Sequence, residues 1–107
     1  MKDQFLEHLL SIIKSKKDEN PKVSYTAMLQ QEDIIETLKK IEEEAFEVIE
    51  AAKLKNKNDI IYEIADLWFH CLVLLAKKDI TVAEITAELQ KRQGVSGIKE
   101  KLNRVKK

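Results

Sequence analysis

The chain has 107 residues, of which 44% are hydrophobic and 36% are charged, a composition that suits a folded globular protein. Lysine plus arginine and aspartate plus glutamate number 19 each, and this zero net charge argues against nucleic-acid or anionic-membrane binding, which needs a basic excess. No apolar run approaches the roughly 20 residues of a membrane span, and charged residues interrupt the apolar positions where a signal peptide would begin. We therefore expect a cytoplasmic protein in which residues 1–107 form a single domain.

Helices are expected throughout, because only two glycines and one proline occur and strand signals are nearly absent. Residues 2–16 predict a first helix whose apolar positions lie on one face. Residues 17–24 predict a loop around Asn20-Pro21, and residues 24–29 predict a short turn or helix. The fold class indicated by this pattern is all-α.

Two long helices follow, over about residues 32–54 and 59–77. The first carries a hydrophobic stripe at helical spacing, and the second is apolar on nearly all sides. The polar turn between them, residues 55–58, is short enough to make the two helices antiparallel neighbours.

A fourth helix is expected to begin at Thr81-Val82-Ala83-Glu84, which has the form of a capping box, and to end near Arg92. The basic tail over residues 98–107 predicts a last short helix. The helix over 59–77 has more apolar surface than one small neighbour can cover. We therefore expect a bundle of four to five helices that is completed by dimerisation, with a homodimer as the partner arrangement.

Four polar side chains interrupt the apolar helix along one edge. They are Asp59, Glu63, Asp66 and His70. Buried carboxylates cost free energy unless a cation or a hydrogen-bond donor meets them. Glu63 and Asp66 have i, i+3 spacing, and Glu44 and Glu47 have the same spacing on the preceding helix. Antiparallel helices can therefore bring the two pairs of acids together. Oxygen ligands without thiolates suit Mg²⁺ or Mn²⁺, and the chemistry that follows is cleavage of a phosphoanhydride.

Each of these signals also has a simpler explanation. The acids of helix 32–54 belong to a charge run, which is usually a solvated face, and Asp59 could be an acid favoured by the helix dipole. Glu63 and Asp66 could pair with lysines, and His70 could be either a core histidine or a substrate contact. The basic residues late in the chain could form a solvated tail or a phosphate clamp. They are Lys91, Arg92, Lys99, Lys101 and Arg104.

The acids also carry a resemblance to a known family. Glu43-Glu44-x-x-Glu47 followed by Glu63-x-x-Asp66 resembles the E-E-x-x-E…E-x-x-D signature of the all-α, MazG-like nucleotide pyrophosphohydrolases. Further segments between Val23 and Arg104 resemble one branch, the phosphoribosyl-ATP pyrophosphohydrolases. They are Ser24-Tyr25-Thr26-Ala27-x-Leu29, Lys39-Lys40-Ile41, Glu63-x-Ala65-Asp66-Leu67-x-x-His70 and Ser96-Gly97-Ile98.

The resemblance implies a nucleotide-binding, Mg²⁺-dependent enzyme that hydrolyses 1-(5-phosphoribosyl)-ATP to 1-(5-phosphoribosyl)-AMP and pyrophosphate, an early step of histidine biosynthesis. It implies a MazG-like bundle, a homodimer and a cytoplasmic setting. Four acids match the metal-binding positions of the family, and Glu43 matches a leading acid that either supports the ligands or positions water. The metal-binding positions are Glu44, Glu47, Glu63 and Asp66. Together, these five acids are the candidate catalytic residues.

Several other residues are candidates for holding the substrate. We expect phosphate contacts from basic side chains, namely Lys40, Arg92, Lys101 and Arg104, and ribosyl or phosphate contacts from Ser24, Tyr25 and His70. The chain departs from the family where glycine is common, at Gln30–Asp33 and at Glu42. Two alternatives share part of the pattern: a sister MazG-like enzyme that hydrolyses dUTP, dCTP or damaged nucleoside triphosphates, and a non-catalytic helical adaptor.

Overall fold

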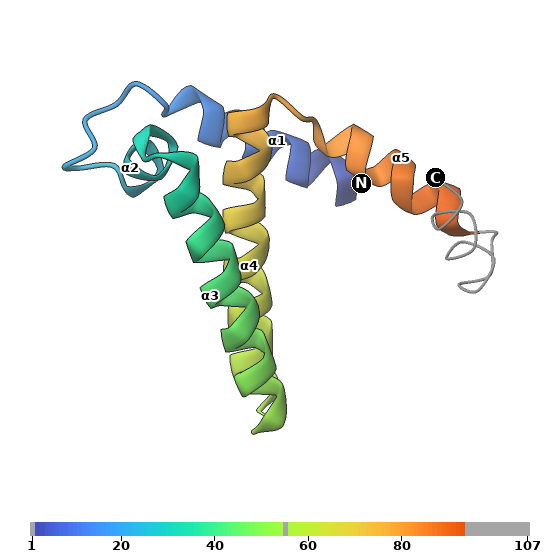
Figure 1. The fold of residues 1–107 in the computed structure, drawn as a ribbon. Coiled ribbons are helices and arrows are strands. Elements are labelled where there is room, and N and C mark those ends of the chain that lie inside the picture. The colour runs from blue at the N-terminus through green and yellow to red at the C-terminus, as the bar shows by residue number, and fades with distance from the viewer. Residues whose placement is uncertain (1, 55, 94–107) are drawn as a thin grey trace.

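The computed structural model describes residues 2–54 and 56–93, and over these residues the chain forms five α-helices and no strands (Figure 1). The helices are α1 (Lys2–Ser15), α2 (Tyr25–Gln31), α3 (Ile34–Lys53), α4 (Lys57–Lys78) and α5 (Val82–Gln93). The prediction of an all-α fold is confirmed. The last short helix that was expected over residues 98–107 lies outside the described residues.

Side-chain caps decide where the two long helices begin. The Asp33 carboxylate accepts a hydrogen bond from the Ile35 amide at 2.8 Å, so α3 begins at Ile34, two residues later than expected. The Asn56 side chain accepts hydrogen bonds from the Asn58 and Asp59 amides, at 3.0 and 3.2 Å. Helix α4 therefore begins at Lys57, two residues earlier than expected. The capping box predicted at Thr81 is present, since its hydroxyl accepts from the Glu84 amide and the glutamate carboxylate accepts from the Thr81 amide.

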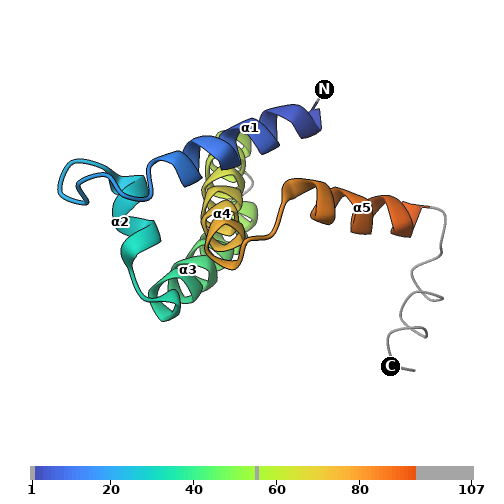
Figure 2. The same cartoon turned by 90° about the horizontal axis from the view of Figure 1, so that it is seen from above.

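Helices α3 and α4 form a long antiparallel hairpin, as the short polar turn predicted. Figure 1 shows this hairpin as an arm that projects downward, with α1 and α2 packed at its upper end. Figure 2 shows α1 crossing the top of α4 while α5 leaves from the end of α4. The buried core lies where α1, α2, α4 and α5 meet. It consists of Leu10, Ile13, Leu29, Leu72, Val73 and Val82.

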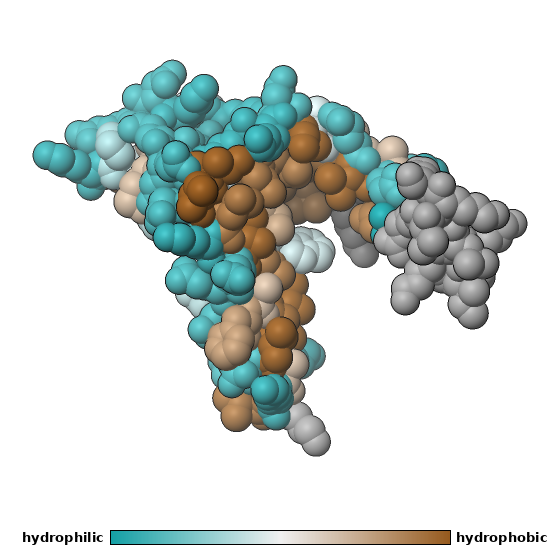
Figure 3. Space-filling model, viewed as in Figure 1, coloured by the Kyte–Doolittle hydropathy of each residue, from teal (hydrophilic) through white to brown (hydrophobic). Residues whose placement is uncertain are grey.

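The arm itself is thinly covered, because only two helices share its length. Many of its large apolar side chains are exposed, and Figure 3 shows hydrophobic surface running along the arm and into the angle below the α1–α5 end. An apolar cleft of about 500 Å³ lies in that angle between α1, α4 and α5, with Trp68, Leu75 and Leu89 among its lining residues. None of the described helices is long and apolar enough to cross a membrane.

Candidate metal centre

The hairpin brings acids of α3 and α4 together with one imidazole. One ligand atom from each of Glu44, Asp66 and His70 lies within 4.8 Å of the others. Glu44 comes from α3 and the other two residues come from α4, one helical turn apart, so the antiparallel pairing creates the cluster. The group lies close to α2, because His70 contacts Tyr25, the first residue of that helix.

Electrostatic coupling extends the cluster to all four predicted metal-binding acids. Burial, followed by the neighbouring Asp66 and then by the charges of Glu63 and Glu47, raises the pKa of Glu44 to about 7. The pKa of Glu63 is also raised, first by loss of hydration and then by the charges of Glu47, Asp66 and Asp59. The charges of the neighbouring carboxylates therefore make ionisation of Glu44 and Glu63 less favourable.

The donor set fits a hard divalent cation. Glu44 Oε2 is buried and has no hydrogen-bond partner among the described residues, which is costly for a carboxylate oxygen. A cation beside this oxygen would supply the missing partner and offset the repulsion among the acids. Among the described residues the cluster contains no cysteine, and carboxylates from two facing helices suit Mg²⁺ or Mn²⁺.

The raised pKa of Glu44 predicts a pH-dependent stability in the metal-free protein. The folded protein binds this proton more tightly than the unfolded chain does, so the stabilising effect is complete below about pH 4.5 and is lost as pH rises through about 7. Glu44→Gln places a neutral amide at the same position. We expect it to melt several degrees above the wild type at pH 8 and to show little difference near pH 4.5.

Thermal unfolding in the presence of a chelator at the two pH values measures this difference. Glu42→Gln is the matched control, because Glu42 is an exposed acid on the same helix. Its melting temperature should track that of the wild type at both pH values. An equal stability difference for Glu44→Gln at pH 4.5 and pH 8 would contradict the assignment.

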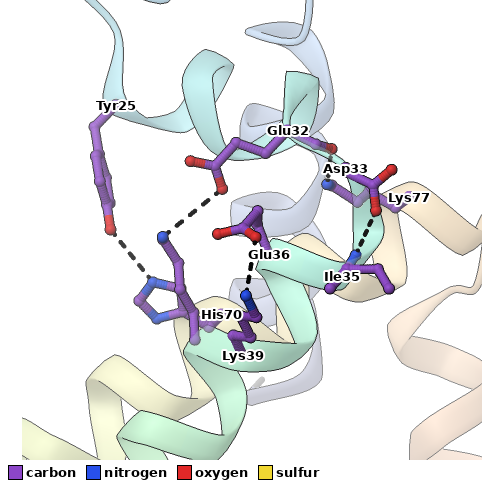
Figure 4. A network of polar contacts seen from close by, with 9 residues as sticks. Tyr25, Glu32, Asp33, Ile35, Glu36, Lys39, His70 and Lys77 are labelled. Atoms are coloured by element: carbon purple, nitrogen blue, oxygen red, sulfur yellow. Dashed lines mark hydrogen bonds and ion pairs between the residues drawn. The ribbon is translucent and has the colours of Figure 1, made fainter.

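A tyrosine and a histidine contact one another next to the acid cluster, and Figure 4 shows the two side chains. His70 is only 3% exposed, and its Nδ1 atom lies 2.8 Å from the Asp66 carbonyl oxygen and 3.7 Å from Asp66 Oδ1. Its other ring nitrogen, Nε2, lies 3.4 Å from the Tyr25 hydroxyl. The first residue of α2 is thereby linked to the middle of α4.

Lys40 and Glu32 lie next to this pair. Lys40 Nζ is 3.8 Å from Glu32 Oε2, with both side chains about a quarter exposed, and the Glu32 backbone carbonyl accepts a hydrogen bond from Lys77. Burial raises the pKa of Tyr25; Lys40 opposes this shift, whereas Asp66, Glu32 and Glu44 add to it. Glu32 was not predicted as a site residue, because it lies between two helices where no periodic pattern marks it.

The remaining candidates differ in where they lie. Ser24 caps α2, since its hydroxyl accepts from the Ala27 amide at 3.1 Å, and Glu43 is exposed. Arg92 pairs with Glu88 at 3.2 Å near the end of α5, well away from the acids within one chain (Figures 1 and 2). Lys101 and Arg104 lie outside the described residues.

The departures from the family's glycines have structural consequences. Gln30 donates hydrogen bonds from its side chain to the Ile13 and Thr26 carbonyls, and Gln31 donates to the Lys17 and Glu19 carbonyls. These two side chains tie α2 to the end of α1 and to the following loop. Glu42 is exposed on α3, where its charge is solvated.

Acids that converge from both helices of an antiparallel hairpin, in an all-α chain, fit the class of MazG-like nucleotide pyrophosphohydrolases. Comparison with known families identifies the branch, because the phosphoribosyl-ATP pyrophosphohydrolase family model matches residues 6–93. The chain belongs to the phosphoribosyl-ATP pyrophosphohydrolase family. This result confirms the resemblance seen in the sequence.

Curated relatives agree with the family match along nearly the whole chain. A phosphoribosyl-ATP pyrophosphatase of Nitrosomonas eutropha is 50% identical over 99 residues, which cover 92% of this chain and 85% of the relative. One of Vesicomyosocius okutanii is 50% identical over 102 residues, covering 95% and 97%. One of Hydrogenovibrio crunogenus is 44% identical over 110 residues, covering 99% and 97%.

Proposed function

We propose that this protein hydrolyses 1-(5-phosphoribosyl)-ATP to 1-(5-phosphoribosyl)-AMP and pyrophosphate, a step of histidine biosynthesis. The observation that carries the proposal is the convergence of carboxylates on the α3–α4 hairpin, in a chain that matches this family over residues 6–93. The names of the curated relatives support the same reaction. The proposal includes a cytoplasmic location, where the substrate would be available.

The acids would hold Mg²⁺, with Mn²⁺ as a possible substitute, through Glu44, Glu47, Glu63 and Asp66. When bound, such an ion neutralises phosphate charge and lowers the pKa of a coordinated water that can attack the α/β phosphoanhydride. The buried, partnerless oxygen of Glu44 and the mutual repulsion of the acids support this assignment. Exposed Glu43 would support the ligands or position water at the edge of the cluster.

Basic side chains would hold the phosphates outside the metal site. Lys40 is the one placed beside the acids, and its partner Glu32 lies 3.8 Å away, so a phosphate oxygen could compete for the ammonium group. Arg92 would reach the acids only from a second subunit, because α5 points away from them in its own chain. Lys101 and Arg104 remain candidates for binding phosphates. Ser24 is a further candidate, because its hydroxyl proton can be donated to a phosphate oxygen.

A homodimer would cover the apolar surface of the arm. Exposed large hydrophobic side chains occur on α3, α4 and α5, and those of α4 and α5 include residues that line the cleft. A monomer rarely leaves so much apolar surface in water. The exposed side chains include Leu38, Phe46, Ile61, Trp68 and Leu89. Isologous packing of this face on a second copy would bury it on both subunits at once.

Steady-state kinetics on competing substrates test the reaction directly. We expect Mg²⁺-dependent release of pyrophosphate from phosphoribosyl-ATP, with kcat/KM at least about a hundredfold above the values for dUTP, dCTP and ATP. Preference for one of the three simple nucleotides would favour a sister MazG-like enzyme. Absence of both pyrophosphate release and a Mg²⁺-dependent thermal shift would indicate a helical adaptor.

A further inference from the structure

When the imidazole ring of His70 is neutral, its two contacts fix which ring nitrogen carries the proton. The Asp66 carbonyl oxygen is only an acceptor, so Nδ1, at 2.8 Å, must donate to it. In a neutral imidazole the other nitrogen is then an acceptor. The Tyr25 hydroxyl lies 3.4 Å from that nitrogen and is therefore the donor of the second hydrogen bond.

This arrangement changes what Tyr25 can offer to a ligand. Its single hydroxyl proton is directed at His70, so the outward side of the phenolic oxygen presents lone pairs only. The tyrosine as a whole is 54% exposed, so a bound molecule can reach this residue. A phosphate oxygen only accepts hydrogen bonds, so it would gain none from the Tyr25 oxygen. A hydroxyl group of a ligand can donate a hydrogen bond to that oxygen.

The position of Tyr25 indicates which hydroxyl group it would meet. Tyr25 contacts His70 and His70 contacts Asp66, so the phenol lies one side chain beyond the acids that would hold the triphosphate. The group that is bonded to the α-phosphate of the substrate is a ribose. Lys40, whose charge acts on the Tyr25 hydroxyl and which pairs with Glu32, provides a nearby cation for phosphate, which leaves Tyr25 for the sugar.

We propose that the Tyr25 hydroxyl oxygen accepts a hydrogen bond from a hydroxyl of the ribose attached to the α-phosphate, and that His70 is the positioning residue that orients it. The inference rests on the proposed function. It also takes His70 out of the metal's ligand set, since both of its ring nitrogens already have partners in the protein.

Substrate analogues test the proposal. Phosphoribosyl-ATP is compared with its analogues made from 2′-deoxy-ATP and from 3′-deoxy-ATP, in the wild type and in Tyr25→Phe. We expect the wild type to prefer the ribose substrate over at least one analogue by about tenfold or more in kcat/KM. Tyr25→Phe should lose most of that preference through a raised KM, with kcat within about threefold of the wild type.

The second tyrosine of the chain provides the control. Tyr62 is exposed on α4, and Tyr62→Phe should keep the wild-type preference. His70→Ala should lose the preference although the Tyr25 hydroxyl is still present, and the double variant should show no further loss. A wild type that accepts both analogues as well as the ribose substrate, or a Tyr25→Phe variant that still discriminates fully, would overturn the proposal.

A spectroscopic measurement separates this inference from the proposed function. The ¹⁵N spectrum of His70 in the substrate-free protein should show a protonated Nδ1 and an unprotonated Nε2, and saturation with Mg²⁺ should leave that pattern unchanged. This measurement is made on the wild-type protein and does not depend on enzymatic activity. A protonated Nε2 in the neutral ring, or a ring nitrogen that binds the metal, contradicts the role of His70 whatever substrate is hydrolysed.

Discussion

Asp66→Asn is expected to lower kcat for phosphoribosyl-ATP by at least about a hundredfold at saturating Mg²⁺. Asparagine keeps the size of the side chain but removes the charge that attracts a divalent cation. The effect is expected to be large because Asp66 belongs to the ligand cluster with Glu44 and also raises the pKa of that residue. The thermal shift produced by Mg²⁺ should also be lost or greatly reduced.

Two comparisons separate catalysis from folding in this variant. The metal-free form of Asp66→Asn should be no less stable than the wild type at pH 8, because one repulsive charge has been removed from the cluster. Glu42→Gln, an exposed acid on α3, should keep wild-type turnover. Retention of wild-type kcat by Asp66→Asn would show that the acid cluster is not the metal site.

The hairpin and its acids follow from short-range rules. The i, i+3 spacing places each acid pair on one helix face, and the short turn at residues 55–58 makes the helices antiparallel neighbours, so the convergence of Glu44 with Asp66 was predictable. The observed starts of α3 and α4 each differ by two residues from the predicted starts, because side-chain caps determine them. The side chains of Asp33 and Asn56 accept hydrogen bonds from free amides in the first turn of each helix. Hydrophobic periodicity alone does not indicate which residue will act as the cap.

Contacts between residues far apart in the sequence were not predictable in the same way. Tyr25 and His70 are 45 positions apart, and each was a separate substrate candidate without any sign that they touch. Glu32 was assigned to the start of a helix, but it caps the end of α2 and faces Lys40. Arg92 was grouped with the phosphate candidates by charge, whereas the direction of α5 depends on packing against α1.

The exposed arm links the fold to the proposed assembly. Trp68 is 56% exposed and lines the apolar cleft on one side of α4, and His70 is buried on the same helix. A partner subunit seated in the cleft would hold α4 from the side away from α3.

Trp68→Glu should convert the proposed dimer into a monomer at micromolar concentration. Burying a tryptophan at the centre of an interface often contributes more than 2 kcal/mol, and a buried unpaired carboxylate adds a further cost, so the dissociation constant should rise by at least about a hundredfold. Analytical ultracentrifugation across a dilution series measures the change. Val23→Glu is the matched control, because Val23 is 82% exposed in the loop before α2, outside the cleft. It should remain dimeric, and a Trp68→Glu variant that is equally dimeric would place the interface elsewhere.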